Sequence, residues 1–137
     1  MPARFGPVIG TRALQSLRTG GPVTVEVEKP KRQPNGDWRC RVRIRGLGRA
    51  WIGQAFGVDS LQALQLIFPT LRQHTASFAA QLAWNNVAGD LGFYRLVPDI
   101  FDPPANRRIH RAVDRAIRAE TAALLRARRR RRGAAAA

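Results

Sequence analysis

The sequence predicts an α+β fold in which a small antiparallel sheet packs against one long helix. Three observations support this class: a strictly alternating stretch at residues 37–45, a strong turn signal just before it, and a capped apolar helix after it. The expected element order is β-β-β-α-β, followed by a basic helix and a disordered tail. The predicted regions are a weakly structured arm at 1–22, the α+β domain at 23–98, the basic helix at 99–125 and the tail at 126–137.

The alternating stretch predicts a half-buried strand, because successive side chains of a β-strand point to opposite faces. One face carries only apolar residues, namely Trp38, Cys40, Val42 and Ile44. The other face carries four arginines, here called the sheet arginines: Arg39, Arg41, Arg43 and Arg45. We expect the apolar face to pack under the long helix.

A second alternating stretch at 23–28 precedes a linker that contains Asn35-Gly36, a pair typical of tight turns. Two such stretches around a turn predict an antiparallel hairpin. Its glutamates would then partly neutralise the sheet arginines across the strand pair. The expected register places these partners opposite one another: Val27 and Trp38, Glu26 and Arg39, Thr24 and Arg41.

Residues 49–56 predict a third strand, and Asp59 with Gln62 predicts a capping box at the start of the long helix. The apolar stripe of this helix continues to about residue 84, with Pro69 inside it. Proline removes one helical hydrogen bond, so we expect a kink or a break there. The stripe consists of Leu61, Leu64, Phe68, Leu71, Thr75, Phe78 and Leu82.

Two further elements follow the long helix. Residues 93–97 predict a short fourth strand, and Asp102 followed by Pro103 predicts the cap and first turn of a last helix. That helix has a narrow apolar stripe and many arginines. Six arginines within residues 126–132 repel one another, which is typical of a solvated, mobile tail.

The charge of the chain indicates a polyanionic or acidic partner. Net charge is +15, and residues 104–137 hold 11 basic and 2 acidic residues. Nucleic acid, an acidic protein face and an anionic lipid surface all fit such a balance. The chain has 22 Arg and only 2 Lys, so GC-rich coding is an alternative source of the excess. No apolar run is long enough to span a membrane, and no apolar leader follows Arg4, so we expect a cytoplasmic protein.

No residue pattern predicts catalysis, a metal or another cofactor. His74 and His110 lack a ligand partner three or four residues away, and the lone Cys40 is expected in the core. Ser60 lies at a helix start outside any nucleophile motif. The sequence therefore predicts a non-enzyme, with an unrecognised hydrolase as the weakest alternative.

The core resembles a bacterial domain family of unknown function over about residues 20–98. The resemblance rests on the strand from Gly36 to Gly46, the helix start from Gly57 to Leu66, and Gly89-Asp90-Leu91-Gly92-Phe93. It implies no activity. The β-β-β-α order is also similar to the small domain of HicB-type antitoxins, although Gln62 and Ala63 stand where that pattern tends to have acidic residues.

Two function hypotheses remain. The first is a non-catalytic bacterial interaction module, acting as an antitoxin-, immunity- or accessory-like partner of another protein. The second is a nucleic-acid-binding protein. The candidate polyanion-binding residues are Arg39, Arg41, Arg43, Arg45, Arg126, Arg128, Arg129, Arg130, Arg131 and Arg132. No feature of the sequence predicts an oligomeric state.

Overall fold

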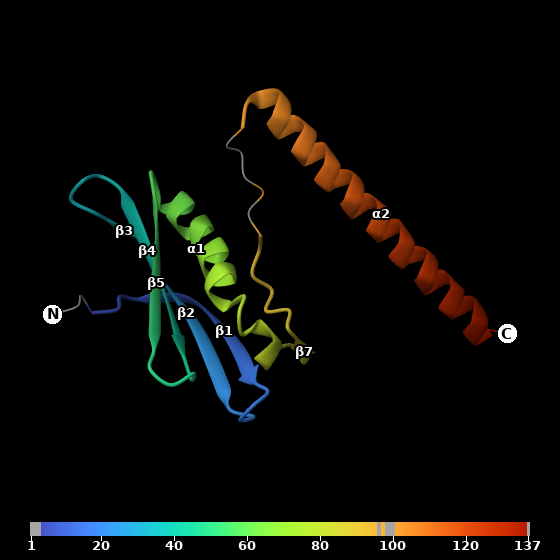
Figure 1. Ribbon diagram of the computed structural model, residues 1–137, viewed down its shortest axis with the longest axis horizontal. Coiled ribbons are helices and arrows are strands. Elements are labelled where there is room, and N and C mark those ends of the chain that lie inside the picture. The colour runs from blue at the N-terminus through green and yellow to red at the C-terminus, as the bar shows by residue number, and fades with distance from the viewer. Residues whose placement is uncertain (1–3, 96, 98–100, 137) are drawn as a thin grey trace. The chain divides into compact units, whose positions relative to one another are not determined.

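The computed structural model describes residues 4–95, 97 and 101–136. The chain divides into two compact units, residues 1–96 and residues 97–137. The first unit is an α+β domain, and the second is dominated by one helix (Figure 1). In chain order the strands are β1 (Val8–Ser16), β2 (Pro22–Glu28), β3 (Lys31–Arg32), β4 (Trp38–Arg45), β5 (Trp51–Gly57), β6 (Leu82–Trp84) and β7 (Val87–Ala88). The helices are α1 (Ser60–Thr75), a 3₁₀ turn η1 (Ala79–Gln81) and α2 (Pro103–Ala136).

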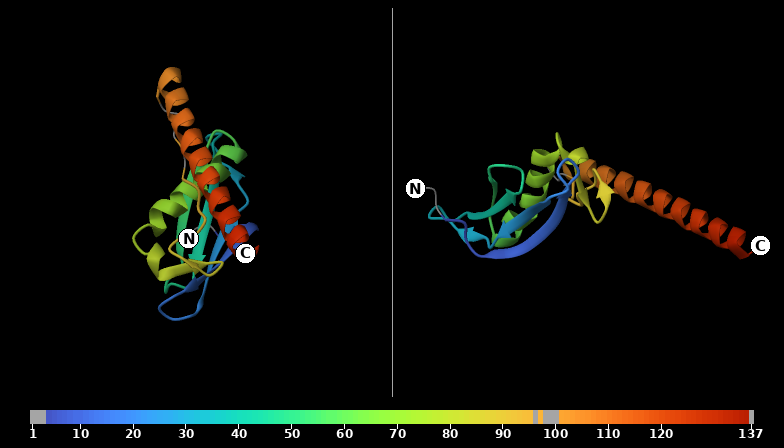
Figure 2. Two further views of the ribbon diagram at one scale, coloured as in Figure 1. Left: turned by 90° about the vertical axis from the view of Figure 1, so that its right-hand side faces the viewer. Right: turned by 90° about the horizontal axis from the view of Figure 1, so that it is seen from below.

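Strand β4 organises the sheet because it pairs with three others, all antiparallel. Strand β5 runs along one edge of β4, while β2 and then β3 follow the other edge. Beyond β2 the described sheet continues through β1, β6 and β7. Helix α1 lies across one face of this sheet, and Figure 2 shows the strands from further directions. The small antiparallel sheet and the long helix predicted from the sequence are therefore present.

The expected hairpin register is wrong by four residues. Glu26 lies opposite Arg43 and Val27 opposite Val42, whereas the sequence predicts Arg39 and Trp38 as their partners. The physical reason is strand β3, which forms the tight end of the hairpin and pairs Arg32 with Trp38. A shift of four keeps each side chain on its expected face, because the strand period is two.

Strand β1 corrects the expectation that residues 1–22 form a weakly structured arm. It pairs with β2 along almost its whole length and with β6 through Gln15 and Ser16. Its inward positions include Arg12 and Ser16 beside a single large apolar residue, Leu14. This mixed face hides the alternation by which strands are recognised.

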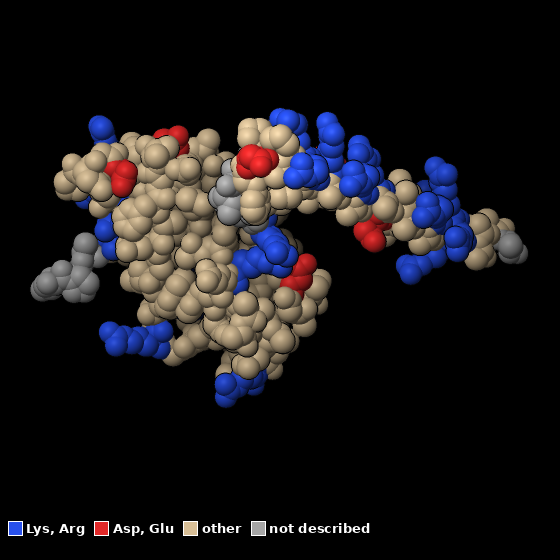
Figure 3. Space-filling view, turned by 45° about the horizontal axis from the view of Figure 1, so that its top comes forward, with Lys and Arg blue, Asp and Glu red and all other residues tan. Residues whose placement is uncertain are grey.

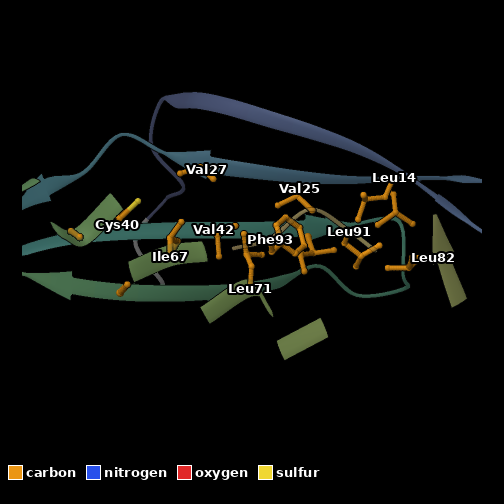
Figure 4. Packing of buried hydrophobic residues seen from close by; sticks show 14 residues of the cluster. Leu14, Val25, Val27, Cys40, Val42, Ile67, Leu71, Leu82, Leu91 and Phe93 are labelled. Atoms are coloured by element: carbon orange, nitrogen blue, oxygen red, sulfur yellow. The ribbon is translucent and has the colours of Figure 1, made fainter. Parts of the chain in front are cut away.

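The apolar face of β4 packs under α1 as predicted. Cys40 and Val42 are fully buried, and Ile67 and Leu71 of α1 lie against them (Figure 4). Burying such side chains stabilises the fold by about 1.5–3 kcal/mol each. Gly57 lets the two layers meet, because a Cβ there would collide with the backbone nitrogen of Ala63.

Helix α1 begins as the sequence predicts and ends earlier. The Asp59 carboxylate accepts from the Gln62 backbone, as the first half of a capping box requires. The Gln62 side chain accepts from the backbone of Val58, one residue before the cap, and not from Asp59 itself. The helix continues across Pro69 without a break into two. It ends at Thr75 rather than near residue 84. Its buried stripe is Ala63, Ile67, Leu71 and Thr75. Leu71 and Thr75 lie in the expected stripe, whereas Ala63 and Ile67 are buried in place of Leu64 and Phe68.

A short hairpin replaces the end of the predicted helix. Strands β6 and β7 pair around Asn85 and Asn86, which both have positive φ angles, of 47° and 64°. Asparagine tolerates this conformation better than most residues, and such two-residue turns suit hairpins. The fourth strand expected at 93–97 is absent from the described part of that segment, and residue 96 lies outside it.

Helix α2 begins where the sequence predicts and extends further. Asp102 caps it by accepting a 2.8 Å hydrogen bond from the backbone of Ala105. The expected disordered tail at 126–137 is wrong for its described residues, because the helix continues to Ala136. Arginine and alanine are both good helix formers, which offsets part of the repulsion between clustered charges. No described helix has the length and apolarity needed to cross a membrane.

Candidate polyanion-binding surfaces

Most of the sheet arginines are engaged by two glutamates of β2. Glu28 receives hydrogen bonds of 2.6 Å from both Nε and Nη2 of Arg41, and this pair is buried. Glu26 is shared between Arg43, at 2.7 Å, and Arg45, at 2.8 Å. Three of the four sheet arginines therefore already have a carboxylate partner.

The electrostatics of the two glutamates reflect these contacts. The hydrogen bonds from Arg41 lower the pKa of Glu28 and outweigh the effect of burial. Burial raises the pKa of Glu26, but the hydrogen bonds and charges of Arg43 and Arg45 together bring it below its ordinary value. Both glutamates are thus held ionised at neutral pH.

The chain before β1 covers part of the same sheet face. The Gly6 amide donates to Glu28, and Arg41 Nη2 donates to the backbone oxygen of Arg4 at 2.6 Å. The Phe5 ring centre lies 4.4 Å from the guanidinium carbon of Arg43, within the range of cation–π contacts. Sequence reasoning missed this segment, whose signal was limited to one aromatic residue between an arginine and a glycine. The sheet face that carries the sheet arginines is therefore less accessible in its middle than the sequence alternation suggests.

Arg39 differs from the other sheet arginines. Its Nε is buried and has no hydrogen-bond partner among the described residues. Lys31 lies directly opposite it on β3, and Phe56 lies opposite it on β5. The glutamate that the sequence predicts as its partner, Glu26, lies by Arg43 instead. Arg39 is thus the one sheet arginine that has no carboxylate partner among the described residues and whose charge remains available to a ligand.

Helix α2 presents its arginines in two ways. At 3.6 residues per turn, one face of the helix collects these side chains: Arg107, Arg108, Arg111, Arg115, Arg118, Arg126 and Arg129. The opposite face carries the apolar residues Ile109, Val113, Ala116, Ile117 and Leu124. Residues 128–132 add arginines around the whole circumference, and all arginines of α2 are exposed. Figure 3 shows basic side chains along the visible face of this helix. None of them forms an ion pair with a described residue.

Among the residues considered for catalysis and metal binding, His74 and Cys40 have packing roles in the α+β unit. The His74 ring stacks on Trp51 with ring centres 3.6 Å apart, and burial lowers the pKa of His74. Cys40 is fully buried, and burial together with the Glu28 charge raises its pKa to about 11. No cluster of three or more His, Cys, Asp or Glu residues suited to a metal occurs within the described ranges.

A surface cavity of about 510 Å³ lies at the end of the sheet, beside the stacked rings of Trp51 and His74. Its walls are apolar at Ile44, Trp51 and Phe78, and Arg18 and Arg49 also line it. Two further cavities surround Arg39 at the other end of β4.

The fold and these surfaces define a small α+β domain joined to an arginine-rich helix. The chain belongs to a family described as a domain of unknown function (DUF6968), whose sequence model matches residues 10–95. This match covers α1 and the whole sheet except the first two residues of β1, and it ends before α2. Neither the curated proteins nor the solved structures contained a match to the chain.

Proposed function

We propose that this protein is a non-catalytic binding protein that contacts nucleic acid through the arginine face of α2. The observation that carries the proposal is the contrast between the two sets of arginines. Arg41, Arg43 and Arg45 of the sheet are paired with glutamates, whereas the exposed arginines of α2 have no carboxylate partner among the described residues. Unpaired guanidinium groups are the ones that can neutralise phosphates and release their counterions.

The dimensions of α2 support a nucleic acid as its ligand. From Arg107 to Arg129 the arginine face extends over about 33 Å at the usual helical rise of 1.5 Å per residue. This is about one turn of duplex DNA, whose major groove admits an α-helix. Arginine also binds phosphate through two parallel hydrogen bonds, which lysine cannot do.

The proposal is tested by measuring the binding of labelled duplex and single-stranded oligonucleotides to the full chain by fluorescence anisotropy. We expect affinity to fall linearly on a log–log plot as salt rises from about 50 to 300 mM, with a steep slope. Binding that is absent at the lowest salt, or that does not change with salt, would contradict the proposal.

A protein partner is the second candidate function, and the outer edge of β5 favours it. Within the described residues, β5 pairs with β4 along one edge only. Ile52 and Phe56 are half exposed on its outer face, with Leu61 exposed nearby in sequence at the start of α1. A free strand edge beside apolar side chains suits the addition of a partner's strand. An antitoxin-, immunity- or accessory-like role would use such an edge.

This second function is tested with one substitution and a matched control. Ile52→Asp should abolish co-purification of a protein partner that persists after nuclease treatment. Val87→Asp introduces the same charge at a similarly exposed apolar site on β7, and it should leave that co-purification unchanged. Equal effects of the two substitutions, or loss of the partner on nuclease treatment, would argue against the β5 edge.

A further inference from the structure

The surroundings of Arg39 contain more positive charge than the protein itself balances. A surface cavity of about 330 Å³ lies between the chain before β1 and the start of β4. Its charged lining residues are Arg4, Lys29, Lys31, Arg39, Arg41 and Glu28. Five cations therefore face one carboxylate. A second cavity, of about 540 Å³, adjoins the same Lys31 and Arg39 from the hairpin side.

The single carboxylate is already committed. Both oxygens of Glu28 accept from Arg41, and one of them also accepts from the Gly6 amide. Arg39 contributes to lowering the pKa of Glu28 through its charge, but it forms no hydrogen bond to it in the structure. The carboxylate thus satisfies Arg41 and leaves the hydrogen-bonding capacity of Arg39 unused.

Two features of Arg39 are unfavourable unless an anion is bound. Its side chain lies directly opposite Lys31, and like charges opposite one another weaken a strand pair. Its buried Nε–H has no acceptor among the described residues, although buried donors are nearly always paired. An acceptor with negative charge in the cavity would relieve both.

We propose that Arg39 and Lys31 form a binding site for a phosphate group, with Lys29 and Arg4 at its rim. Arginine supplies planar paired donors and lysine a mobile point charge, a combination that suits phosphate. The surplus of cations favours a doubly charged group over a carboxylate. The site lies in the α+β unit, so it does not depend on the proposed binding of nucleic acid by α2.

The site is tested by isothermal titration calorimetry of the full chain with inorganic phosphate, with sodium chloride keeping the ionic strength constant. We expect saturable binding that weakens at least roughly tenfold in Arg39→Gln and in Lys31→Gln, since each removes a charged donor. Lys31 is exposed, so its substitution leaves the core intact even if Arg39→Gln perturbs folding. The matched control is Arg49→Gln, an exposed arginine in the turn at the other end of β4, which should bind phosphate like the unchanged protein.

A second pair of probes distinguishes the source of the phosphate group. A short oligonucleotide with a 5′-phosphate is compared with the same oligonucleotide ending in a 5′-hydroxyl. A preference for the 5′-phosphate that disappears in Arg39→Gln identifies a nucleic-acid end, whereas saturable inorganic phosphate binding without that preference identifies a small phosphate ligand. The proposal is overturned if neither probe shows saturable binding that depends on Arg39, or if Arg39→Gln and Arg49→Gln weaken binding equally. Failure of nucleic-acid binding by α2 would leave the result with inorganic phosphate unchanged.

Discussion

Arg41 and Glu28 form a two-point ion pair on the outer face of the sheet, with both hydrogen bonds at 2.6 Å. Their side chains are only 9% and 7% exposed, because the chain before β1 lies over them. The pair therefore links three segments: β2, β4 and the residues that lead into β1. It also explains why an arginine in the middle of an outer sheet face is not available to a ligand.

Removing the charge of Glu28 should destabilise the fold substantially. Glu28→Gln keeps the shape of the side chain but removes the carboxylate that faces the buried Arg41 guanidinium, which costs about 3 kcal/mol or more. The measurement is urea unfolding followed by circular dichroism. Glu120→Gln, in an exposed position of α2, is the control and should change stability by less than about 0.5 kcal/mol. A loss below about 1 kcal/mol for Glu28→Gln would show that the pair is solvated.

Acid should unfold the protein through Glu26 and Glu28. The pKa values of both are lower in the fold than their ordinary value of 4.5, so the unfolded chain binds protons first as pH falls. Their contribution to stability is complete above about pH 4.5 and is lost as pH falls through the lower folded pKa values. The free energy of unfolding, measured from pH 7 to pH 3, should therefore decline most steeply below that point.

The control for this pH dependence is Glu26→Gln, which removes one of the two titrating groups. Its free energy of unfolding should depend less on pH in the acid range than that of the unchanged protein. The same acid slope in both would mean that Glu26 does not titrate differently in the fold.

Cys40 should be protected from thiol reagents until the protein unfolds. It is fully buried, and a pKa raised to about 11 leaves almost no thiolate at pH 8. Reaction with a chromogenic disulfide reagent should be at least about a hundredfold slower in native buffer than in urea. The control is Gln54→Cys in a Cys40→Ala background, because position 54 is exposed on the neighbouring strand. Native Cys40 reacting as fast as this control would contradict the burial.

The sequence predicts those elements whose local pattern also agrees with their packing. The alternation of residues 38–45 matches a strand with one buried face, and that face is buried as expected. The Asp59 cap and the Asp102 cap both form where the side-chain pattern indicates them. In each case a short-range signal and the tertiary environment favour the same structure.

Other elements depend on contacts that one stretch of sequence does not display. Strand β1 places Arg12 on the inward side, where its guanidinium lies 4.2 Å from the Trp84 ring centre, and a charged residue there disguises the strand. The apolar residues around 82–84 fit a helical stripe equally well until the Asn85-Asn86 turn is recognised. Helix α2 continues into its arginine run because the helix propensity of arginine and alanine outweighs the repulsion between the clustered positive charges.

The surface formed by the sheet arginines was likewise predictable from the sequence only in part. The outward direction of the sheet arginines and the presence of two opposing glutamates follow from alternation alone. Which arginine stays unpaired depends on register, and register depends on the short strand β3. The sequence therefore predicts an arginine face but not the distinct position of Arg39 beside Lys31.

The most direct test of the account compares two triple variants by the salt dependence of oligonucleotide binding. Arg107, Arg111 and Arg118 are replaced by Gln in the first, and Arg18, Arg32 and Arg49 in the second; all six are exposed. We predict that the α2 variant lowers the slope of log affinity against log salt by about 2.7 for duplex DNA. The second variant, with the same loss of charge, should keep the original slope. Equal loss in both variants, or unchanged binding by the α2 variant, would contradict the claim that α2 contacts nucleic acid.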